Sequence, residues 1–376
     1  MQPRNYTDIY NKFPEFCQVD NKSANTGNEL SGMSEVDKLK AKLQQANLPA
    51  NLHEKVQDQI GRIELSLKFG GNLSQLDITE KYLDWLTSLP WDKRTEDILD
   101  INKAKEVLDA NHFGLEKLKH RIMEYLSVLI MQKKNLHTNV FRAPSLFFVG
   151  LAGTGKTTFA KSLAESLGRK FVRIPFGGLS SALDLRGQPK TNPIAEPGGI
   201  IRALRRVQVK NPVILLDELD RVTPEARSAI MGALLEILDP GQNVTFTDYY
   251  IDYPFDLSEV LFVATANNTN NVATAVLDRL EVVQMPSYTD QEKMEIGKRY
   301  VLPKYLKNMG LSPDNVTMDD AVWAELVRPL GFEPGIRSLE RVIEGIVRRA
   351  AYRMVSGQGN QFVINSQNLK EFVNQV

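Results

Sequence analysis

The sequence has 376 residues, of which 42% are hydrophobic and 24% charged, as is usual for a globular protein with a buried core. Its 46 Lys and Arg residues balance its 46 Asp and Glu residues, so net charge gives no reason to expect non-specific binding to nucleic acid or to an anionic membrane. The single cysteine excludes an intramolecular disulfide, and the sequence has neither a secretory signal nor an apolar run of the roughly 20 residues that span a bilayer, which favours a cytoplasmic protein.

The N-terminal hundred residues divide into a tail and a helical layer. Residues 1–33 lack sustained periodicity and are rich in Asn, Ser, Gly and Lys, so we expect a flexible tail there. Its aromatic residues could dock on a partner or pack on the body of the protein: Tyr6, Tyr10, Phe13 and Phe16. Residues 34–100 have apolar residues at three- and four-residue spacing, which predicts helices over 34–46, 52–67 and 79–89.

From residue 101 onward the pattern changes to short β-rich runs that alternate with helices. A helix is predicted over 116–132, and strands are predicted over 145–150, 171–176, 213–217, 260–265 and 281–285. Such alternation is typical of a parallel sheet with helices on both faces, so residues 101–288 form an α/β domain in this interpretation. Residues 289–376 are predicted to be helical again and to form a separate subdomain.

The strongest motif is a glycine-rich loop, G-x-x-x-x-G-K-T, at residues 150–157, between a predicted strand and a predicted helix. Its glycines let successive backbone N–H groups turn toward an anion, and the helix dipole adds to this attraction. Lys156 can reach the β- and γ-phosphates of ATP or ADP, and the Thr157 hydroxyl can bind Mg²⁺. We expect the nucleotide to contact Gly150, Gly153, Thr154, Gly155, Lys156, Thr157 and Thr158.

A second motif supplies carboxylates at the end of another strand. The apolar run 213–216 leads into Asp217 and Glu218. Because the C-terminal ends of buried parallel strands face the ligand crevice, Asp217 is placed to hold Mg²⁺ through water. Glu218 is placed to orient and activate the attacking water, a role that hydrolysis requires and simple binding does not.

Several further segments resemble the Lon family of ATP-dependent proteases and its AAA+ ATPase module. They are Tyr82-Leu83-Asp84-Trp85-Leu86, Leu89-Pro90-Trp91, His112-Phe113-Gly114-Leu115-Glu116-Lys117, Phe171-Val172-Arg173-Ile174, Leu234-Leu235-Glu236-Ile237-Leu238-Asp239-Pro240 and Gly335-Ile336-Arg337-Ser338-Leu339-Glu340-Arg341. The resemblance covers roughly residues 35–376. It implies a P-loop AAA+ sheet between helices, preceded by the helical layer and followed by an α-helical lid over residues 289–376.

The resemblance also assigns roles to individual residues. Asn267 matches the sensor-1 position, a polar side chain at a strand end that helps to place the lytic water. Arg337 matches the sensor-2 arginine of the lid, and His112 and Phe113 match the segment that lines the adenine pocket. Arg279 matches the arginine finger that reaches the nucleotide of a neighbouring subunit, although an ion pair with Asp278 or Glu281 is an alternative for this side chain.

An arginine finger supplied by a neighbour implies an oligomeric ring, six subunits by family analogy, that acts on a polypeptide substrate. The sequence departs from the family in three respects. The serine–lysine peptidase domain and the large N-terminal domain are not found in it, so we expect no peptidase activity from this chain alone. In the segment that grips the translocating polypeptide, Asn192 and Pro193 stand where the family has an aromatic–aliphatic pair.

These departures leave several hypotheses open. The leading one is a ring ATPase that unfolds, remodels or threads a protein, alone or with a separate peptidase or adaptor. The alternatives are an ATP-dependent oligomeric switch or scaffold and the ATPase fragment of a full-length Lon protease. A nucleic-acid motor is disfavoured by the neutral charge. The grip could come from Ile194 or from Phe246, Tyr249 and Tyr250 in a predicted hairpin, although core packing is an alternative for these aromatic residues.

Overall fold

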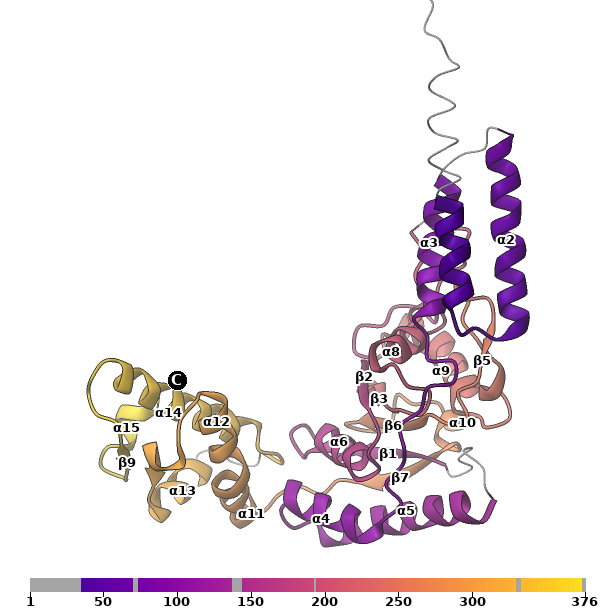
Figure 1. Cartoon of the computed structure of the whole chain (residues 1–376). Coiled ribbons are helices and arrows are strands. Elements are labelled where there is room, and N and C mark those ends of the chain that lie inside the picture. The colour runs from indigo at the N-terminus through magenta and orange to yellow at the C-terminus, as the bar shows by residue number, and fades with distance from the viewer. Residues whose placement is uncertain (1–34, 70–73, 137–143, 193, 329–332, 374–376) are drawn as a thin grey trace, which may run out of the picture. The chain divides into compact units, whose positions relative to one another are not determined.

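The computed structural model describes residues 35–69, 74–136, 144–192, 194–328 and 333–373 (Figure 1). Its chain forms two compact units, Met1–Trp91 and Asp92–Val376. The predicted tail over residues 1–33 and the substituted Pro193 lie outside the described residues. Within the described ranges, no helix combines the length and the apolar character that crossing a membrane requires.

The first unit consists of helices whose apolar stripes face one another. Residues 35–45 are helical, and they are followed by α2 (Ala50–Lys68) and α3 (Ser74–Thr87). The stripes predicted for the first two helices are buried in the structure: Val36, Leu39 and Leu43, then Leu52, Val56, Ile60, Ile63 and Leu67. Helix α3 begins earlier than the predicted Thr79, and Thr79 is itself buried beside Gln59 of α2.

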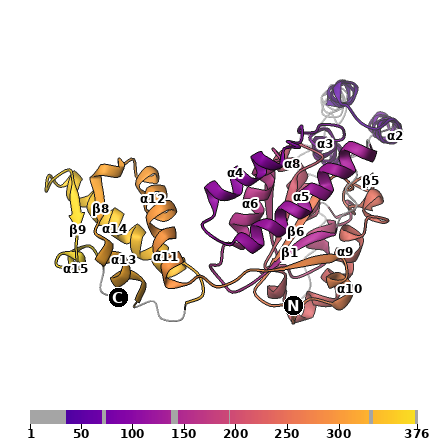
Figure 2. The same ribbon diagram turned by 90° about the horizontal axis from the view of Figure 1, so that it is seen from below.

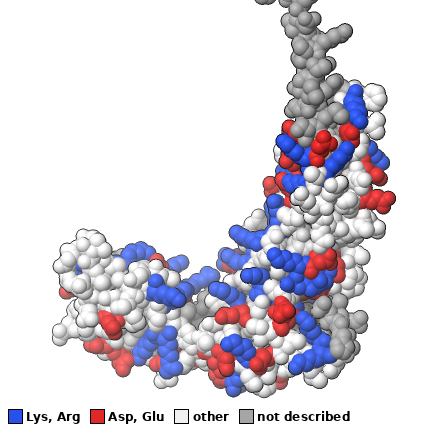
Figure 3. Space-filling view, in the orientation of Figure 1, with Lys and Arg blue, Asp and Glu red and all other residues white. Residues whose placement is uncertain are grey.

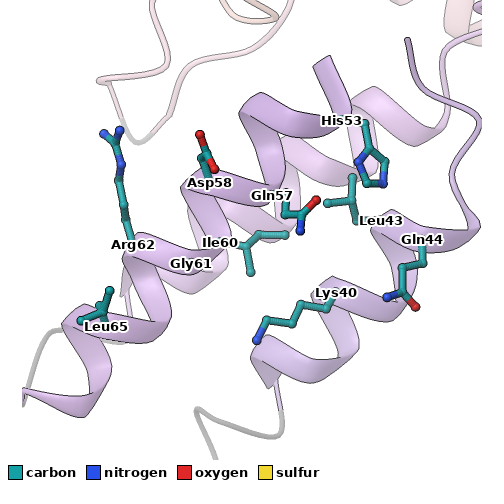
Figure 4. A pocket seen from close by; sticks show the side chains of 10 residues that line it. All are labelled: Lys40, Leu43, Gln44, His53, Gln57, Asp58, Ile60, Gly61, Arg62 and Leu65. Atoms are coloured by element: carbon teal, nitrogen blue, oxygen red, sulfur yellow. The ribbon is translucent and has the colours of Figure 1, made fainter. Parts of the chain in front are cut away.

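A groove of about 640 Å³ lies between the helix over 35–45 and α2 (Figure 4). Its lining combines polar and apolar side chains, among them Lys40, Gln57, Ile60 and Leu65. Lys40 also binds Glu64 at 2.5 Å. All of the lining residues belong to the first unit, so this groove is not part of the predicted nucleotide site.

The second unit is built on a five-stranded parallel sheet. Its strands are β1 (Ser145–Val149), β2 (Phe171–Pro175), β3 (Val213–Asp217), β6 (Leu261–Ala266) and β7 (Leu280–Gln284). They lie in the order β2-β3-β6-β1-β7, and every pair runs parallel. The predicted strands and the predicted α/β fold are therefore confirmed. The apolar runs form buried strands because both faces of the sheet are covered.

Helices cover the two faces of this sheet (Figure 2). On one face, α4 (Ile101–Asn111), α5 (Glu116–Leu136) and α6 (Lys156–Ser166) share a hydrophobic core with alternate residues of β1, β3, β6 and β7. On the other face, α8 (Gly199–Val207) packs along β2, with Ile174 close to Gly199. The rest of the α/β body contains α7 (Leu183–Arg186), α9 (Pro224–Leu238) and α10 (Thr274–Leu277). It also contains the antiparallel pair β4 (Phe246–Thr247) and β5 (Pro254–Phe255).

The C-terminal part of the second unit has a hydrophobic core of its own. It contains α11 (Asp290–Ile296), a π turn over Gly297–Val301, α12 (Leu302–Asn308), α13 (Asp320–Val327), α14 (Arg337–Val355) and α15 (Leu369–Phe372). Two short parallel strands, β8 (Val316–Met318) and β9 (Phe362–Ile364), join it. Helix α11 begins with a capping box between Thr289 and Glu292, so the helical subdomain starts where the sequence pattern places it.

The helical layer was expected to extend to residue 100, but residues 92–100 belong to the second unit because ion pairs hold them on the α/β body. Arg169 binds the fully buried carboxylate of Asp97 through two nitrogens at 2.7 and 2.8 Å, and Lys133 binds it at 2.8 Å. Arg94 makes a forked contact with Glu259. Charged side chains have no apolar periodicity, so this attachment leaves no signature in the hydrophobic pattern.

Candidate nucleotide-binding site

The loop between β1 and α6 has the backbone shape that cradles an anion. Gly153 and Gly155 have φ angles of +82° and +91°, a left-handed conformation that side chains with a Cβ seldom adopt. Helix α6 begins directly afterwards at Lys156 and runs for 11 residues. Thr157 and Thr158 are exposed on its first turn. The loop therefore directs backbone N–H groups and the positive end of a helix dipole at the same place.

Lys156 is buried in this loop and is held by oxygen atoms. Its Nζ donates to the carbonyl oxygens of Gly150 and Leu151 at 2.5 and 2.9 Å, and to Oδ1 of Asn267 at 3.2 Å. Burial lowers the pKa of the Lys156 ammonium, and the charge of Arg337 lowers it further, whereas the carboxylates of the site oppose this change. The ammonium is thus fixed beside the cradle by groups that a phosphate can replace.

The strand order brings the two predicted halves of the site together. Strand β6 lies between β1 and β3, so its end separates the glycine-rich loop from the acidic pair. Thr265, at this end, donates its hydroxyl to Oδ1 of Asp217 and accepts the backbone N–H of Glu218 at 3.0 Å. Asn267, two residues later, accepts from Lys156. Two residues at the end of β6 therefore bond in opposite directions, Thr265 to the acidic pair and Asn267 to the lysine of the loop.

Glu218 is held in an unusual conformation for a residue with a side chain. Its φ angle is +62°, and its Oε2 lies 3.5 Å from the guanidinium of Arg221. Such left-handed residues concentrate at functional sites, where surrounding contacts compensate for the strain. Here the hydrogen bond from its N–H to Thr265 is one such contact.

Two charged residues of this site were missed by the sequence interpretation. Arg173 of β2 donates from Nε to Oδ2 of Asp217 at 2.5 Å. Asp220 is buried, and its Oδ1 has no hydrogen-bond partner among the described residues. The spacing of Asp220 after the acidic pair, D-E-x-D, was a signal that could have been used. Arg173 had no such signal, because only the register of β2 against β3 brings it to Asp217.

The lid and the residue that precedes it contact the backbone of the glycine-rich loop. The N–H of Ile336 donates to the carbonyl of Gly153 at 3.3 Å, and the hydroxyl of Tyr288 donates to the carbonyl of Thr154 at 3.1 Å. Burial raises the pKa of Tyr288 to about 12, so its proton stays available for this bond. Arg337 begins α14, and its Cγ lies over Gly153. The predicted lid arginine is therefore beside the predicted phosphate loop.

His112 and Phe113 lie where the lid meets the α/β body, but their side chains differ in exposure. His112 is buried, stacks on Phe159 with ring centroids 3.7 Å apart, and exchanges a hydrogen bond with Ser162 at 2.9 Å. Phe113 packs against the core of the lid, under the guanidinium of Arg299. The ring of His112 is thus part of the core, so the segment can meet an adenine through its backbone and Phe113.

Among the described residues, the partners of Arg279 are Asp239 and Ala275, not the lysine or the acidic pair. Its Nη2 binds Oδ2 of Asp239 at 2.9 Å, and its Nη1 donates to the carbonyl of Ala275 at 2.8 Å. The alternative prediction pairs Arg279 with Asp278 or Glu281. In the structure its ion-pair partner is Asp239, directly after α9, and Glu281 instead binds Arg121. A backbone N–H from Gly241 and the side chain of Arg279 lower the pKa of Asp239.

The residues present fit a Mg²⁺–nucleoside triphosphate. The left-handed glycines and Lys156 form a cradle for phosphate oxygens, and Thr157 at the start of α6 offers a hydroxyl. Asp217 offers a carboxylate at the end of β3, which is the oxygen chemistry that Mg²⁺ prefers. Thr157 and Asp217 would hold the metal, as the sequence predicts.

Comparisons with known proteins support this geometry. Residues 146–288 match the ATPase family associated with various cellular activities (AAA), and residues 307–363 match the Lon protease AAA+ ATPase lid domain. The chain carries a Lon-type AAA+ module. An AAA+ module binds nucleotide and hydrolyses ATP as a class, which accounts for the phosphate loop and the acidic pair found here.

Sequence similarity to Lon proteases extends over most of this chain. It is 40% identical to Lon protease 2 of Thermus thermophilus over 91% of this chain and 43% of that protein. It is 41% identical to the Lon protease of Desulforamulus reducens over 88% of this chain and 40% of that protein. The Lon protease of Lawsonia intracellularis is 39% identical over 92% of this chain and 41% of its own length. The chain therefore spans about two fifths of the curated relatives it matches.

The buried ring of His112 predicts a specific loss of stability in acid. Burial and the charge of Lys119 lower the pKa of His112 from 6.5 to about 4. In the unfolded chain His112 therefore binds a proton near pH 6.5, whereas in the folded chain it stays neutral down to about pH 4. Protonation of the unfolded state thus lowers the free energy of unfolding as pH falls from about 6.5 to about 4. We expect the full loss to be about 3 kcal/mol.

The measurement is the free energy of urea unfolding of the wild type and of His112→Gln at pH 7 and at several lower pH values. Because other groups also titrate, the readout is the difference between the two proteins at each pH. This difference should shrink as pH falls toward 4. Parallel curves for the two proteins would show that His112 is not the group responsible.

Proposed function

We propose that this chain binds Mg²⁺–ATP and hydrolyses it within an oligomeric ring, and that the cycle drives the remodelling or threading of a polypeptide. One observation carries the proposal: at the end of β6, Asn267 accepts from Lys156, and Thr265 bonds both Asp217 and Glu218, so the phosphate loop and the acidic pair lie at the ends of adjacent strands. A site that only binds nucleotide has no need of a carboxylate held beside the metal position.

The residues of the site have separate tasks in this reaction. Mg²⁺, held by Thr157 and Asp217, would offset the negative charge that develops on the phosphate. Lys156 would exchange its present carbonyl partners for the β- and γ-phosphates, which places its charge where the transition state gains negative charge. Arg337 would add a second cation from the lid side of the loop.

Glu218 would orient the attacking water and accept its proton on a carboxylate oxygen. The hydrogen bond from its N–H to Thr265 fixes the backbone, so the side chain can rotate without moving the strand end. Its present contact with Arg221 is long, at 3.5 Å, and partly exposed, so this contact can be given up at little cost. Asn267 would hold the water from the other side.

Replacing Glu218 tests this assignment. We expect Glu218→Gln to retain nucleotide binding, because the amide has the same size, and to lower the steady-state ATPase rate by about 10²- to 10⁴-fold. The exposed Glu225 on the first turn of α9 provides a control, and Glu225→Gln should hydrolyse ATP at the wild-type rate. A wild-type chain that binds ATP and never turns it over would instead support the oligomeric switch.

The position of Arg279 supports a role in a neighbouring site. The side chain is partly exposed and is held by Asp239 and Ala275, outside the group formed by Lys156 and the acidic pair. A guanidinium in this posture can be presented to another subunit, where it would stabilise charge on the γ-phosphate. We propose a homo-oligomeric ring, six subunits by family analogy, in which each subunit lends this residue to the next.

Mixing two inactive variants tests whether Arg279 acts between subunits. Lys156→Ala cannot hold phosphate, and Arg279→Ala lacks the finger, so each alone should lose about 10³-fold or more of the ATPase rate. In a mixture, an intact loop can receive Arg279 from a Lys156→Ala neighbour, and activity should return. A mixture of Arg279→Ala with the double variant Lys156→Ala/Arg279→Ala contains no arginine finger and serves as the control. If no mixture recovers activity, Arg279 does not act in trans.

The segment expected to grip the polypeptide is a closed loop with a fixed base. The N–H of Gln188 donates to the carbonyl of Glu196 at 3.1 Å, which closes the loop. Below it, the fully buried Asp248 accepts the N–H of Gly198 at 2.7 Å and those of Tyr250 and Ile251 at 2.8 and 3.1 Å. Burial raises the pKa of Asp248 to about 6, although these N–H groups oppose the shift.

The structure separates the aromatic candidates for the grip. Phe246 and Tyr250 are buried, so they serve core packing. Tyr249 is 39% exposed, and Arg186 lies over its ring, 5.0 Å from the centroid. Ile194 is 80% exposed on the closed loop. We propose that Tyr249 and Ile194 contact the polypeptide in place of the aromatic–aliphatic pair that Asn192 and Pro193 replace.

The basic residues near this loop do not favour nucleic acid. Lys190 pairs with Asp252, and Arg202 lies 3.7 Å from Glu196. Figure 3 shows acidic side chains among the basic ones on the face of the second unit that it displays. A track for a phosphate backbone requires unneutralised charge, so a polypeptide is the better substrate class.

Stimulation of the ATPase by an unfolded protein, such as casein, tests the polypeptide contact. Replacing Tyr249 by Ala should raise the casein concentration for half-maximal stimulation by about tenfold, because it removes an exposed aromatic contact. Val244 is also 39% exposed and lies nearby in sequence, so Val244→Ala is the matched control. Equal shifts for both variants would contradict a specific role for Tyr249.

A further inference from the structure

The carboxylate proposed to hold Mg²⁺ is engaged on both oxygens by protein groups of different kinds. Oδ1 of Asp217 accepts the hydroxyl of Thr265, which is fully buried. Oδ2 accepts Nε of Arg173 at 2.5 Å. The side chain of Arg173 is 49% exposed, whereas that of Asp217 is only 5% exposed. The buried hydroxyl is a permanent partner, and the exposed guanidinium is one that can leave.

The parallel register of the two strands explains how Arg173 reaches this oxygen. Arg173 pairs with Leu215, so the two side chains point to the same face of the sheet. Asp217 is two residues beyond Leu215 and therefore points to that face as well. The arginine side chain is long enough to extend along the sheet to the end of β3. Among the described residues β2 is an edge strand of the sheet, so no described strand lies beyond it to enclose the guanidinium.

We propose that Arg173 is a positioning residue that competes with Mg²⁺ for Asp217. The guanidinium holds Oδ2 of Asp217, one of the two carboxylate oxygens with which this residue would hold the metal. Binding of Mg²⁺–nucleotide must break this ion pair, and loss of Mg²⁺ allows it to form again. Arg173 thus weakens the hold of the site on Mg²⁺ and favours release of the metal with the spent nucleotide. This inference rests on the proposed ATPase function.

The physical basis is that the guanidinium of Arg173 and Mg²⁺ differ in how easily each leaves Asp217. A half-exposed arginine regains water when it leaves, so its ion pair with Asp217 is readily exchanged. Two cations beside one carboxylate repel each other, so the guanidinium weakens the binding of a metal to Asp217. A purely structural ion pair would instead tie β2 to β3, a task already performed by the ladder from Phe171 to Pro175.

The experiment measures binding of a fluorescent ADP analogue to the full chain as Mg²⁺ is titrated. For Arg173→Gln we expect the Mg²⁺ concentration for half-maximal enhancement of binding to fall by roughly fivefold relative to wild type. Binding measured in EDTA should change less than about twofold, since the loop that holds the phosphates is intact. Arg173→Lys keeps the charge and should lie nearer the wild type.

Arg121 provides a matched control outside the site. Its side chain is 51% exposed, and it pairs with Glu281 rather than with Asp217. Arg121→Gln removes the same charge from the same unit and should leave the Mg²⁺ titration unchanged. A shift in this variant equal to that of Arg173→Gln would mean that general charge, not competition at Asp217, controls the metal.

A double-mutant cycle completes the test. In an Asp217→Asn background, Arg173 has no carboxylate to compete for, so Arg173→Gln should no longer shift the Mg²⁺ titration. An unchanged or increased Mg²⁺ requirement in the single variant Arg173→Gln would overturn the inference while nucleotide binding by the wild type still supports the proposed function. A wild type that binds no nucleotide with or without Mg²⁺ would defeat the proposed function itself.

Discussion

The placement of β6 between β1 and β3 is the constraint on which the site depends. In a parallel sheet the C-terminal ends of neighbouring strands meet at one edge, so this order puts Thr265 and Asn267 between the phosphate loop and the acidic pair. Their side chains then bond to both sides, to Asp217 and to Lys156. With another strand order, the same motifs would lie at the same edge without a polar connection between them.

Local patterns predicted the strands and the phosphate loop because the forces that create them are local. Apolar runs such as 213–216 are buried wherever they lie in a sheet, and glycines at 153 and 155 are needed by the turn itself. The contact between Arg173 and Asp217 could not be predicted in this way, because the two residues are 44 positions apart and only the register of β2 against β3 brings them together. The attachment of residues 92–100 escaped notice for a similar reason, since it relies on ion pairs.

The site is surrounded by cations that are each held by a weak or replaceable partner. Lys156 rests on carbonyl oxygens, Arg173 on Asp217, and Arg221 on Glu218. In the proposed function, a triphosphate would attract several of these cations at once and change the partners that the carboxylates hold. Nucleotide binding and release of the acidic pair would then be parts of one exchange of ion pairs.

Asp248 fixes the two ends of the closed loop on the body beneath it. Its carboxylate fixes the N–H of Gly198 and lies so close to Gly187 that a Cβ there would be 2.6 Å from Oδ1. Both ends of the segment 188–196 are therefore set by residues outside the tip. These contacts use no side chain of the tip, so a replacement within the tip would change the surface that the loop presents and not the contacts that fix its ends.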